Sequence, residues 1–315
     1  MSQALKELSF KSRSFSAWQL PIVTDSFFGK ANIKSINTYI LKEYVKYGGI
    51  PVITGFQGVC DNARTTTFGR GGSDLTAVAI AAATNAKRCD IYTDVDGIFT
   101  ADPTLVTTAE KLDQIDYNDM LEMSYSGAKV LQPRAVEYAI KHQVPIKVIS
   151  SFFNGTGTVI GNFENKKIVG VALTDNLEKI NIFFHSEEDF AKLIEFLNDN
   201  LIRFNVFEKT ENYVTIFFNK DEIHGITENL QRRAIVERIE YVSKTIDKSP
   251  ALAKISVIGS GTHQVTNRMI EELERNHIPI TSVSPYNAKI IFWLEEKFSK
   301  KALKLLHDRF VISQE

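Results

Sequence analysis

The sequence predicts an α/β protein in which a domain built on a parallel sheet is followed by two ferredoxin-like units. In the first half of the chain, short β-branched runs alternate with helical stretches, the order that is typical of parallel α/β domains. In the second half, the order strand, helix, strand, strand occurs twice, which is the split β-α-β pattern. The predicted boundaries are 1–163 for the first domain and 164–250 and 251–315 for the two units.

The elements of the first half follow from runs of apolar and helix-forming residues. The run IPVITGFQG at 50–58 predicts a strand buried on both faces. The alanine-rich stretch 73–86 predicts a helix, for which Ser73 or Asp74 can act as the N-cap. The elements predicted after it are a strand at 89–94, a helical region at 126–143 that Pro133 begins or kinks, a strand at 144–150, and a loop with a terminal hairpin at 152–167.

The second half repeats one arrangement of elements without repeating its residues. The first unit is predicted to contain strands at 179–184, 202–208 and 213–218 and helices at 186–200 and 225–233. The second is predicted to contain strands at 254–259, 279–285 and 288–294 and helices at 265–277 and 299–310. Each unit can then form a sheet with one face covered by helices and one face available for association.

Composition excludes several classes of function. The net charge is −1 and the apolar fraction is 43%, so no overall electrostatic field favours nucleic acid or an anionic membrane. No apolar run approaches the ~18 residues of a membrane span, and the first residues lack the apolar core of a signal peptide. Cys60 and Cys89 are isolated and the histidines form no ligand pattern, which predicts a cytoplasmic protein with reduced thiols and no structural metal site.

The segment FGRGGSD at 68–74 has the chemistry of an anion-binding loop. Gly71 and Gly72 allow the backbone to turn tightly and to approach a ligand closely. The helix that follows directs its free N–H groups and the positive end of its dipole to the same place. Arg70 adds a planar fork that matches a carboxylate or a phosphate. The alternative is an ordinary tight turn before a capped helix, with a solvated arginine.

A second polar loop, YTDVDGIFTADP at 92–103, follows the next predicted strand. Asp94, Asp96 and Asp102 lie within nine residues, at the end of a strand where ligands of α/β sheets bind. Beside an anion-binding loop, these carboxylates suit the ribose and the Mg²⁺ of a nucleotide. The alternative is a polar loop of Asx-turns. Lys129, in SGAKVLQPR, can reach a phosphate or can be a solvated helix lysine.

The three motifs GRGGSD, TDVDGIFTADP and GAKVLQPRAVEYA, in this order and at these separations, resemble the aspartate kinases of the amino-acid kinase family. VITGFQG before them and VPIKVISSF after them fit the same pattern, so the resemblance covers residues from about 5 to 170. The second half resembles the paired ACT domains of these enzymes. The fold that the resemblance implies is an amino-acid-kinase-type α/β domain followed by two ferredoxin-like ACT domains.

The resemblance also implies an activity and a set of ligands. Aspartate kinases transfer the γ-phosphoryl group of ATP, with Mg²⁺, to the side-chain carboxylate of L-aspartate, the first step toward lysine, threonine, methionine and diaminopimelate. It implies a cytoplasmic homodimer that associates through its ACT units. Phosphoryl transfer needs positioning and charge neutralisation more than a covalent nucleophile, which agrees with the absence of a Ser-His or Cys-His pair among the motifs.

By the same resemblance, site residues can be named in three groups. Arg70, Gly71, Gly72 and Ser73 are the expected substrate-binding residues, and Asp74 is the expected catalytic residue that orients the groups around the transferring phosphoryl. The expected nucleotide-binding residues are Thr93, Asp94, Phe99, Thr100, Ala101, Asp102, Pro103 and Lys129. No metal-ligating residue is predicted.

Some positions depart from the family pattern. Thr104 and Gln132 stand where the family usually has arginine and histidine. The strand with a Lys-Phe/Tyr-Gly-Gly motif, the Ser-Ala loop and the Gly-Glu-Arg segment that open these kinases have no counterpart here. We therefore expect an N-terminally incomplete kinase domain, inactive alone or supplied with the missing segment by another chain. The alternative function is an inactive homologue or a regulatory subunit that retains the ACT pair.

The predicted turns before the helices of the ACT-like units also differ from the family. They read FFHSEEDF and SGTHQVTN, without the Pro-Gly turn that is common in effector-binding ACT domains. We therefore expect weak binding of lysine or threonine, or none.

Overall fold

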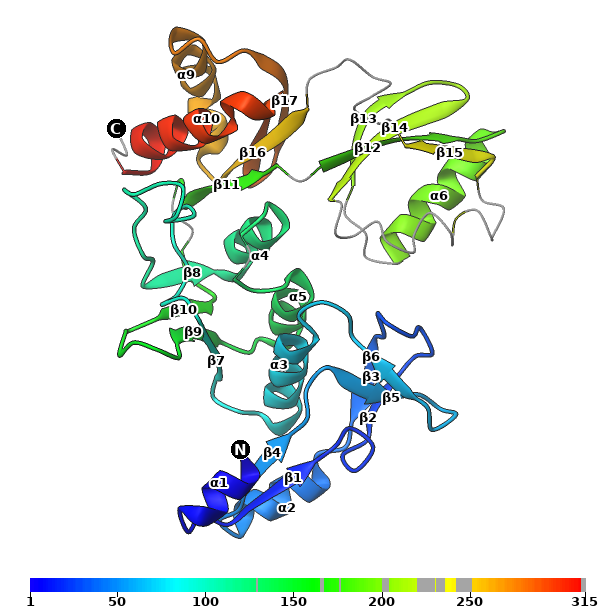
Figure 1. Ribbon diagram of the computed structural model, residues 1–315, viewed down its shortest axis with the longest axis vertical. Coiled ribbons are helices and arrows are strands. Elements are labelled where there is room, and N and C mark those ends of the chain that lie inside the picture. The colour runs from blue at the N-terminus through cyan, green and yellow to red at the C-terminus, as the bar shows by residue number, and fades with distance from the viewer. Residues whose placement is uncertain are drawn as a thin grey trace. The chain divides into compact units, whose positions relative to one another are not determined.

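The computed structural model describes residues 1–128, 130–164, 167–175, 177–199, 204–219, 230, 236–241 and 251–312 (Figure 1). The chain divides into two compact units. Unit 1 contains Met1–Pro103, Thr107–Ser124 and Ala128–Val169, and unit 2 contains Thr104–Val106, Tyr125–Gly127 and Gly170–Glu315. Lys129 and, apart from Leu230, the helix predicted at 225–233 lie outside the described residues.

Unit 1 alternates strands and helices along the chain. Its helices are α1 (Ser2–Glu7), α2 (Tyr39–Lys46), α3 (Gly72–Thr84), α4 (Tyr117–Tyr125) and α5 (Pro133–His142). Its strands are β1 (Ser12–Phe15), β2 (Ile22–Thr24), β3 (Ile33–Ile36), β4 (Ile50–Ile53), β5 (Gln57–Val59), β6 (Thr65–Thr67), β7 (Cys89–Thr93), β8 (Gln114–Asp116), β9 (Ile146–Ser150) and β10 (Thr158–Gly161).

The strands of unit 1 pair both in parallel and in antiparallel, so the predicted α/β class is confirmed with mixed sheets. Among the described residues the sheets have the orders β1-β4, β3-β2-β5-β6 and β7-β9-β10-β8. Parallel pairs join β1 to β4, β2 to β5, β7 to β9 and β8 to β10. β10 runs antiparallel to β9 because the chain returns directly after β9, so the hairpin predicted within 152–167 differs in extent: β10 pairs with the preceding strand β9.

The alanine-rich sequence of α3 explains how this helix packs. Leu75, Val78 and Ala79 are buried on it, and Ala135 and Ala139 are buried on α5. Small side chains on both helices allow a close approach, and α3 and α5 lie side by side (Figure 1). The predicted helix at 73–86 is thus confirmed, but the predicted cap is wrong.

The N-cap of α3 is Gly71, with φ 66° and no side-chain cap, and Ser73 and Asp74 lie inside the first turn. The left-handed conformation that this cap requires is open to glycine and costly for serine or aspartate.

Two other predicted elements differ in extent. The run at 50–58 divides into β4 and β5, because the chain turns where Gly55 meets Ser73 at the start of α3; a Cβ atom on Gly55 would lie 3.3 Å from Ser73 Cα. Among the described residues of 126–143, only Pro133–His142 are helical. Pro133 is the first residue of α5, as predicted, and Gly127 takes a φ of 109° after the end of α4.

Unit 2 contains two four-stranded antiparallel sheets in its described residues. The first has the order β13-β14-β12-β15, and its elements are β12 (Leu177–Phe183), α6 (Glu187–Asp199), β13 (Asn205–Lys209), β14 (Tyr213–Asn219) and β15 (Arg238–Tyr241). The second has the order β11-β16-β18-β17, and its elements are β11 (Gly170–Thr174), β16 (Leu252–Ile258), α9 (Thr262–Arg275), β17 (Ile280–Tyr286), β18 (Lys289–Glu295), η1 (Glu296–Phe298), α10 (Ser299–Leu306) and η2 (His307–Ile312). Both sheets confirm the predicted ferredoxin-like order.

β11 and β15 complete these sheets and were not predicted. β11 falls in the range predicted for the first unit, yet it pairs with β16 of the second sheet, from Gly170 opposite Ile258 to Thr174 opposite Lys254. The sheet therefore crosses the predicted boundary at 250.

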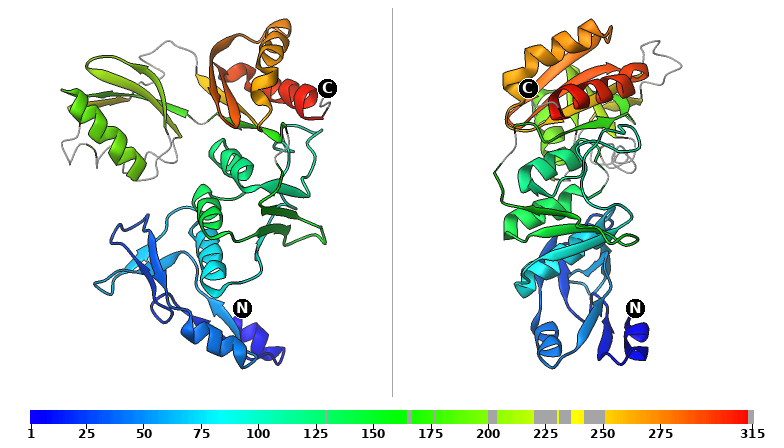
Figure 2. Two further views of the ribbon diagram at one scale, coloured as in Figure 1. Left: turned by 180° about the vertical axis from the view of Figure 1, so that it is seen from behind. Right: turned by 90° about the vertical axis from the view of Figure 1, so that its left-hand side faces the viewer.

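Each sheet of unit 2 packs against its own helices. Leu193 and Leu197 of α6 contact Ile180, Ile182 and Val214 of the first sheet in one buried cluster, and Figure 2 shows α6 along that sheet. α9 contacts β17 and β18, and α10 contacts β11 and β16. None of the helices in the described part of the chain is long and apolar enough to cross a bilayer.

Candidate active site

The glycine-rich loop joins β6 to α3 in unit 1. Gly71 has a left-handed φ of 66°, and a Cβ atom at this position would overlap the side chain of Gln132, the N-cap of α5. Gly72 is buried, and a Cβ atom there would lie 2.9 Å from both Phe56 and Phe68. Both positions therefore exclude larger residues. The two glycines allow the segments that contain Gln132 and Phe56 to lie close to the start of α3.

Arg70 and Ser73 are exposed at this helix start. The turn is closed by Gly72 N–H donating to Gly69 O at 3.0 Å and Leu75 N–H donating to Gly71 O at 3.2 Å. Because the N-cap is a glycine, no side chain caps the first turn of α3. The first N–H groups of a helix have no partner within the helix. The arrangement can therefore receive an anion between backbone N–H groups and a guanidinium.

Asp74 lies half-buried in the first turn of α3. Burial raises the pKa of its carboxyl group. Thr76, two residues further, fixes the loop that follows β4, since its hydroxyl accepts from Phe56 N–H at 3.0 Å and donates to Gly72 O at 2.7 Å. Phe56 has a φ of 72°, an uncommon conformation for a phenylalanine, so this hydrogen bond holds a strained turn against α3. Thr76 was not singled out from the sequence.

The second loop begins where β7 ends. Thr93 lies opposite Ser150 in the parallel pair of β7 and β9, and Thr93 O accepts from Ser151 N–H at 2.7 Å. The Thr93 hydroxyl donates to Asp94 Oδ1 at 3.1 Å, and Asp94 is exposed. Thr93 and Asp94 thus lie at the carboxyl ends of two parallel strands, the edge of an α/β sheet where ligands bind.

The three aspartates of this loop have different surroundings. Asp96 pairs with Lys111, with Oδ2 and Nζ 2.8 Å apart, and Lys111 Nζ also donates to Thr156 Oγ1 at 3.0 Å. The hydrogen bond from Lys111 lowers the pKa of Asp96. Asp96 therefore ties the loop to the segment before β10, while Asp94 and Asp102 are exposed. Lys111, the partner, was not predicted, because nothing in its local sequence marks it.

The segment from Phe99 to Pro103 is held at one end and exposed at the other. Phe99 forms an antiparallel bridge with Lys111, and Thr100 N–H donates to Glu110 O at 2.9 Å. The side chains of Thr100 and Ala101 are buried, at 5% and 4% exposure, whereas Asp102 and Pro103 are exposed. Thr100 and Ala101 can therefore offer a ligand little beyond their backbone.

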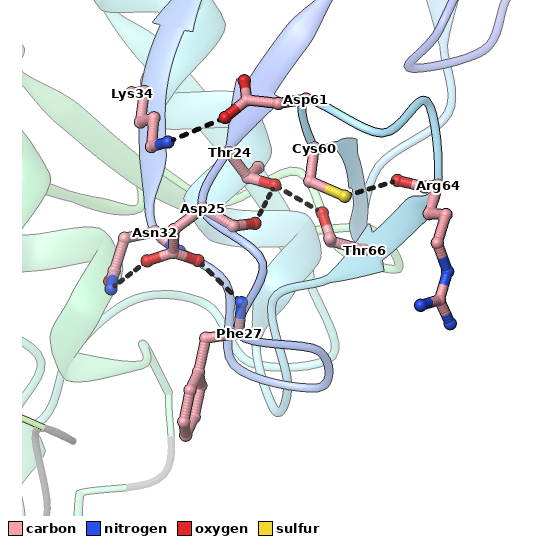
Figure 3. Close-up of polar contacts among 9 residues, drawn as sticks. All are labelled: Thr24, Asp25, Phe27, Asn32, Lys34, Cys60, Asp61, Arg64 and Thr66. Carbon is pink, nitrogen blue, oxygen red and sulfur yellow. Dashed lines mark hydrogen bonds and ion pairs between the residues drawn. The ribbon is translucent and has the colours of Figure 1, made fainter.

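A further loop, at residues 25–32, lies against the glycine-rich loop. Ala31 N–H donates to Thr67 O at 2.9 Å, and a Cβ atom on Gly69 would lie 2.8 Å from Gly29 O. Figure 3 shows how Asp25 closes this loop by accepting from Asn32 and from Phe27 N–H. Burial opposes ionisation of Asp25, but these hydrogen bonds outweigh it, so the pKa of Asp25 is lowered.

The structure thus brings the predicted substrate-binding residues together around the start of α3, and it groups the predicted nucleotide-binding residues from Thr93 to Pro103 on one loop. α3 and β7 pack against each other. Lys129 lies outside the described residues. In the described part of the chain, no group of three or more His, Cys, Asp or Glu side chains is placed to hold a metal ion.

Comparisons with known proteins agree with the fold and identify the family. The model of the amino acid kinase family matches residues 1–150. An aspartokinase of Rickettsia felis is 37% identical over 99% of this chain and 79% of that protein. Aspartokinase III of E. coli in complex with aspartate and ADP, in the R-state, has a TM-score of 0.77 and 25% identity, over 98% of this chain and 71% of that one. The same enzyme with lysine and aspartate, in the T-state, has a TM-score of 0.67 and 26% identity, over 96% and 70%.

The identity to the curated relative extends along almost the whole chain, through both the α/β domain and the two ferredoxin-like sheets. The motif from Arg70 to Asp74 lies at the start of α3, and the motif from Thr93 to Pro103 lies at the end of β7 and in the loop after it. Together these findings show an enzyme of the aspartate kinase type, and the chain belongs to the aspartokinase family.

Proposed function

We propose that this chain transfers the γ-phosphoryl group of ATP to the side-chain carboxylate of L-aspartate, and so forms aspartyl phosphate for amino-acid biosynthesis. The observation that carries the proposal is the glycine N-cap of α3, which leaves the helix start without a side-chain cap next to the exposed Arg70. The E. coli neighbour, which was solved with aspartate and ADP, supports aspartate and an adenine nucleotide as the ligands.

Each group of residues has a role in this proposal. Arg70 binds a carboxylate of aspartate, with the backbone of Gly71, Gly72 and Ser73 around it, because a guanidinium pairs with a carboxylate through two parallel hydrogen bonds. Asp74 orients the groups that surround the transferring phosphoryl. The transfer itself needs in-line positioning and neutralisation of charge on the phosphoryl oxygens, which N–H groups and cations provide.

The nucleotide is proposed to bind at the loop after β7. Thr93 and Asp94 line it, and Phe99, Thr100, Ala101, Asp102, Pro103 and Lys129 complete its site. Mg²⁺ usually binds one or two carboxylates together with the phosphates of its substrate. The exposed carboxylate of Asp94 fits this use, whereas Asp96 is paired with Lys111. The bound ion would neutralise phosphate charge.

The test is a hydroxamate assay for aspartyl phosphate, with purified chain, Mg-ATP and L-aspartate. D-aspartate and L-glutamate serve as substrate controls. A second sample contains a separately expressed N-terminal kinase segment, because such a segment is the other partner that the sequence predicts. Hydroxamate formed from L-aspartate but not from D-aspartate or L-glutamate supports the proposal, and its formation in the second sample only would show that the chain acts together with the N-terminal segment. Binding of aspartate and ADP without hydroxamate in either sample would instead favour a regulatory role.

Association is part of the proposal. The two ACT-like sheets are proposed to form a homodimer through their strand edges and through the parts of their helix-free faces that the contact of Phe217 with Ile291 and Trp293 does not already bury. Light scattering at micromolar concentration should give twice the mass of the 35.5 kDa chain. A monodisperse species at the mass of one chain would contradict the dimer.

A further inference from the structure

Arg134, the second residue of α5, donates hydrogen bonds to two loops that lie far from it in the sequence. Its Nη1 donates to Phe68 O at 2.7 Å. Its Nη2 donates to Ala31 O at 2.7 Å and to Asn32 Oδ1 at 3.0 Å. One planar guanidinium therefore joins the start of a helix to a segment 66 residues earlier and to another about a hundred residues earlier.

The first of these segments carries the predicted substrate-binding residues. Phe68 is buried, at 1% exposure, and it precedes Gly69 and Arg70 directly. On the other side of Arg70, Gly71 lies against the side chain of Gln132, the N-cap of α5. The start of α5 thus holds the chain on both sides of Arg70.

The second segment is a loop that hydrogen bonds have already closed. Asp25 Oδ1 accepts from Asn32 N–H at 3.0 Å, and Asp25 Oδ2 accepts from Asn32 Nδ2 at 2.8 Å (Figure 3). Because the amide nitrogen of Asn32 is directed to Asp25, its Oδ1 is available to Arg134. A continuous series of hydrogen bonds runs from Asp25 through Asn32 and Arg134 to Phe68.

We infer that Arg134 is a positioning residue that clamps the loop at 25–32 to the glycine-rich loop and so fixes where Arg70 points. The contacts support this role directly, and its kinetic consequence rests on the proposed function. Arginine suits the position because its fork reaches three acceptors, whereas a lysine offers a single nitrogen. Misplacement of a binding group by about 1 Å can cost about 10²-fold in rate.

The expected effects are selective for aspartate. Arg134→Ala should lower kcat/KM for aspartate about 100-fold, the cost expected for a misplaced group. Arg134→Lys, which retains one donor, should lower it about tenfold. The KM for ATP should stay within about twofold of wild type, because the loop from Thr93 to Pro103 is held by contacts with Lys111, Glu110 and Ser151, whereas Arg134 holds the other two loops. Guanidinium ion, at concentrations that do not denature the protein, should restore part of the activity of Arg134→Ala.

The experiment compares the full chain with Arg134→Ala, Arg134→Lys and the control Arg88→Ala. Arg88 is a suitable control because it lies just before β7 and pairs with Asp90 inside that strand. Hydrogen exchange is measured for peptides covering 26–33 and 66–73. Faster exchange of both peptides in Arg134→Ala, with no change in Arg88→Ala, is the expected result. Unchanged exchange in a folded Arg134→Ala, or an equal rise in KM for ATP and aspartate that guanidinium does not reverse, would overturn the inference.

Further variants and the exchange measurement keep a failure of the Arg134 inference distinct from misfolding of a variant and from a failure of the proposed function. If Arg134→Ala does not fold, Arg134→Lys and Asn32→Ala are used, since each removes part of the same series of hydrogen bonds. If wild type shows no turnover either alone or with the separately expressed N-terminal segment, the proposed function fails, whereas the exchange of the two loops still decides whether Arg134 holds them.

Discussion

Arg70 is the residue whose chemistry matters most for substrate recognition in the proposed site. Arg70→Lys keeps the positive charge and removes the planar fork. We expect aspartate binding to weaken about tenfold, which corresponds to about 1.4 kcal/mol. Isothermal titration calorimetry with L-aspartate measures this change, and Arg88→Lys is the matched control on an exposed ion pair. Equal affinities of wild type and Arg70→Lys would remove Arg70 from the site.

Asp119 is a buried carboxylate whose surroundings disfavour its charge. It lies in the first turn of α4 at 1% exposure, and its Oδ1 has no hydrogen-bond partner among the described residues. Burial, with smaller effects from Asp116 and Glu122, raises the pKa of Asp119 from 3.8 to about 6. Since the folded state holds this proton more tightly than the unfolded state, the stability that the group contributes is complete below pH 4 and is lost as the pH rises through about 6.

Asp119→Asn should therefore stabilise the protein at neutral pH. A shift of about two pKa units corresponds to about 3 kcal/mol at most. Urea unfolding at pH 5 and pH 8 should show an advantage of the variant that grows with pH. Asp113→Asn, at an exposed position close by, is the control and should show no such trend. An advantage of Asp119→Asn that is the same at both pH values would show that its carboxyl group does not titrate in this range.

At the scale of elements, the start of α3 depends on Gly71. Gly71→Ala imposes the left-handed penalty of about 1–2 kcal/mol and also an overlap with Gln132. Gly48→Ala is the matched control, because Gly48 has a similar φ of 74° and no atom within 4 Å of the added Cβ. Gly71→Ala should destabilise the protein more than Gly48→Ala in urea unfolding.

A second substitution separates the backbone penalty of Gly71→Ala from the overlap with Gln132. Gln132→Gly removes both Cγ and Cβ of Gln132, each of which would overlap the added Cβ atom, and leaves the backbone penalty, so Gln132→Gly should restore part of the stability that Gly71→Ala loses. Strict additivity of the two substitutions would contradict the contact between the glycine-rich loop and the start of α5.

The elements near the site were predictable where local chemistry determines them. The alanine-rich sequence of α3, Pro133 at the start of α5 and the polar loop after β7 all follow from neighbouring residues. Contacts between distant segments were not predictable. No local pattern distinguishes Arg134, which bonds Phe68, from a solvated helix arginine. The same holds for Lys111, which pairs with Asp96. The roles assigned to the site residues stay predictions until they are measured.

At the scale of the whole molecule, strands that pair in a sheet are not always close to each other in the chain. β11 precedes the first sheet of unit 2 and pairs with β16, about eighty residues later. A fragment cut at the predicted boundary of 250 would lose β11 and expose the edge of β16, and exposed edges favour aggregation. Sequence repeats identify the two similar units, but they do not show which distant strand completes each sheet.

Regulation also belongs to this scale, because an effector bound to unit 2 would have to act on the site in unit 1. The turns before α6 and α9 determine whether backbone N–H groups are available to bind an amino acid. At α6, Ser186 Oγ accepts from Asp189 N–H at 3.2 Å and donates to Asp189 Oδ2 at 3.0 Å. Phe190 N–H donates to Ser186 O. At α9, the Thr262 hydroxyl donates to Gly259 O at 3.0 Å. At the start of α6, the backbone N–H groups of Asp189 and Phe190 are thus already hydrogen-bonded to Ser186.

We therefore expect lysine to bind weakly or not at all, although the E. coli neighbour was solved with lysine. A thermal-shift titration tests this, since a ligand at 100 times its Kd stabilises the folded state by about 2.7 kcal/mol. Ser186→Gly opens the start of α6 and is the informative variant, because it removes the hydroxyl that occupies the Asp189 amide. Wild type should show no saturable shift at sub-millimolar lysine. A clear shift in wild type would mean that lysine reaches unit 2 by contacts other than these turn amides, and the cap at Ser186 would then have no part in excluding it.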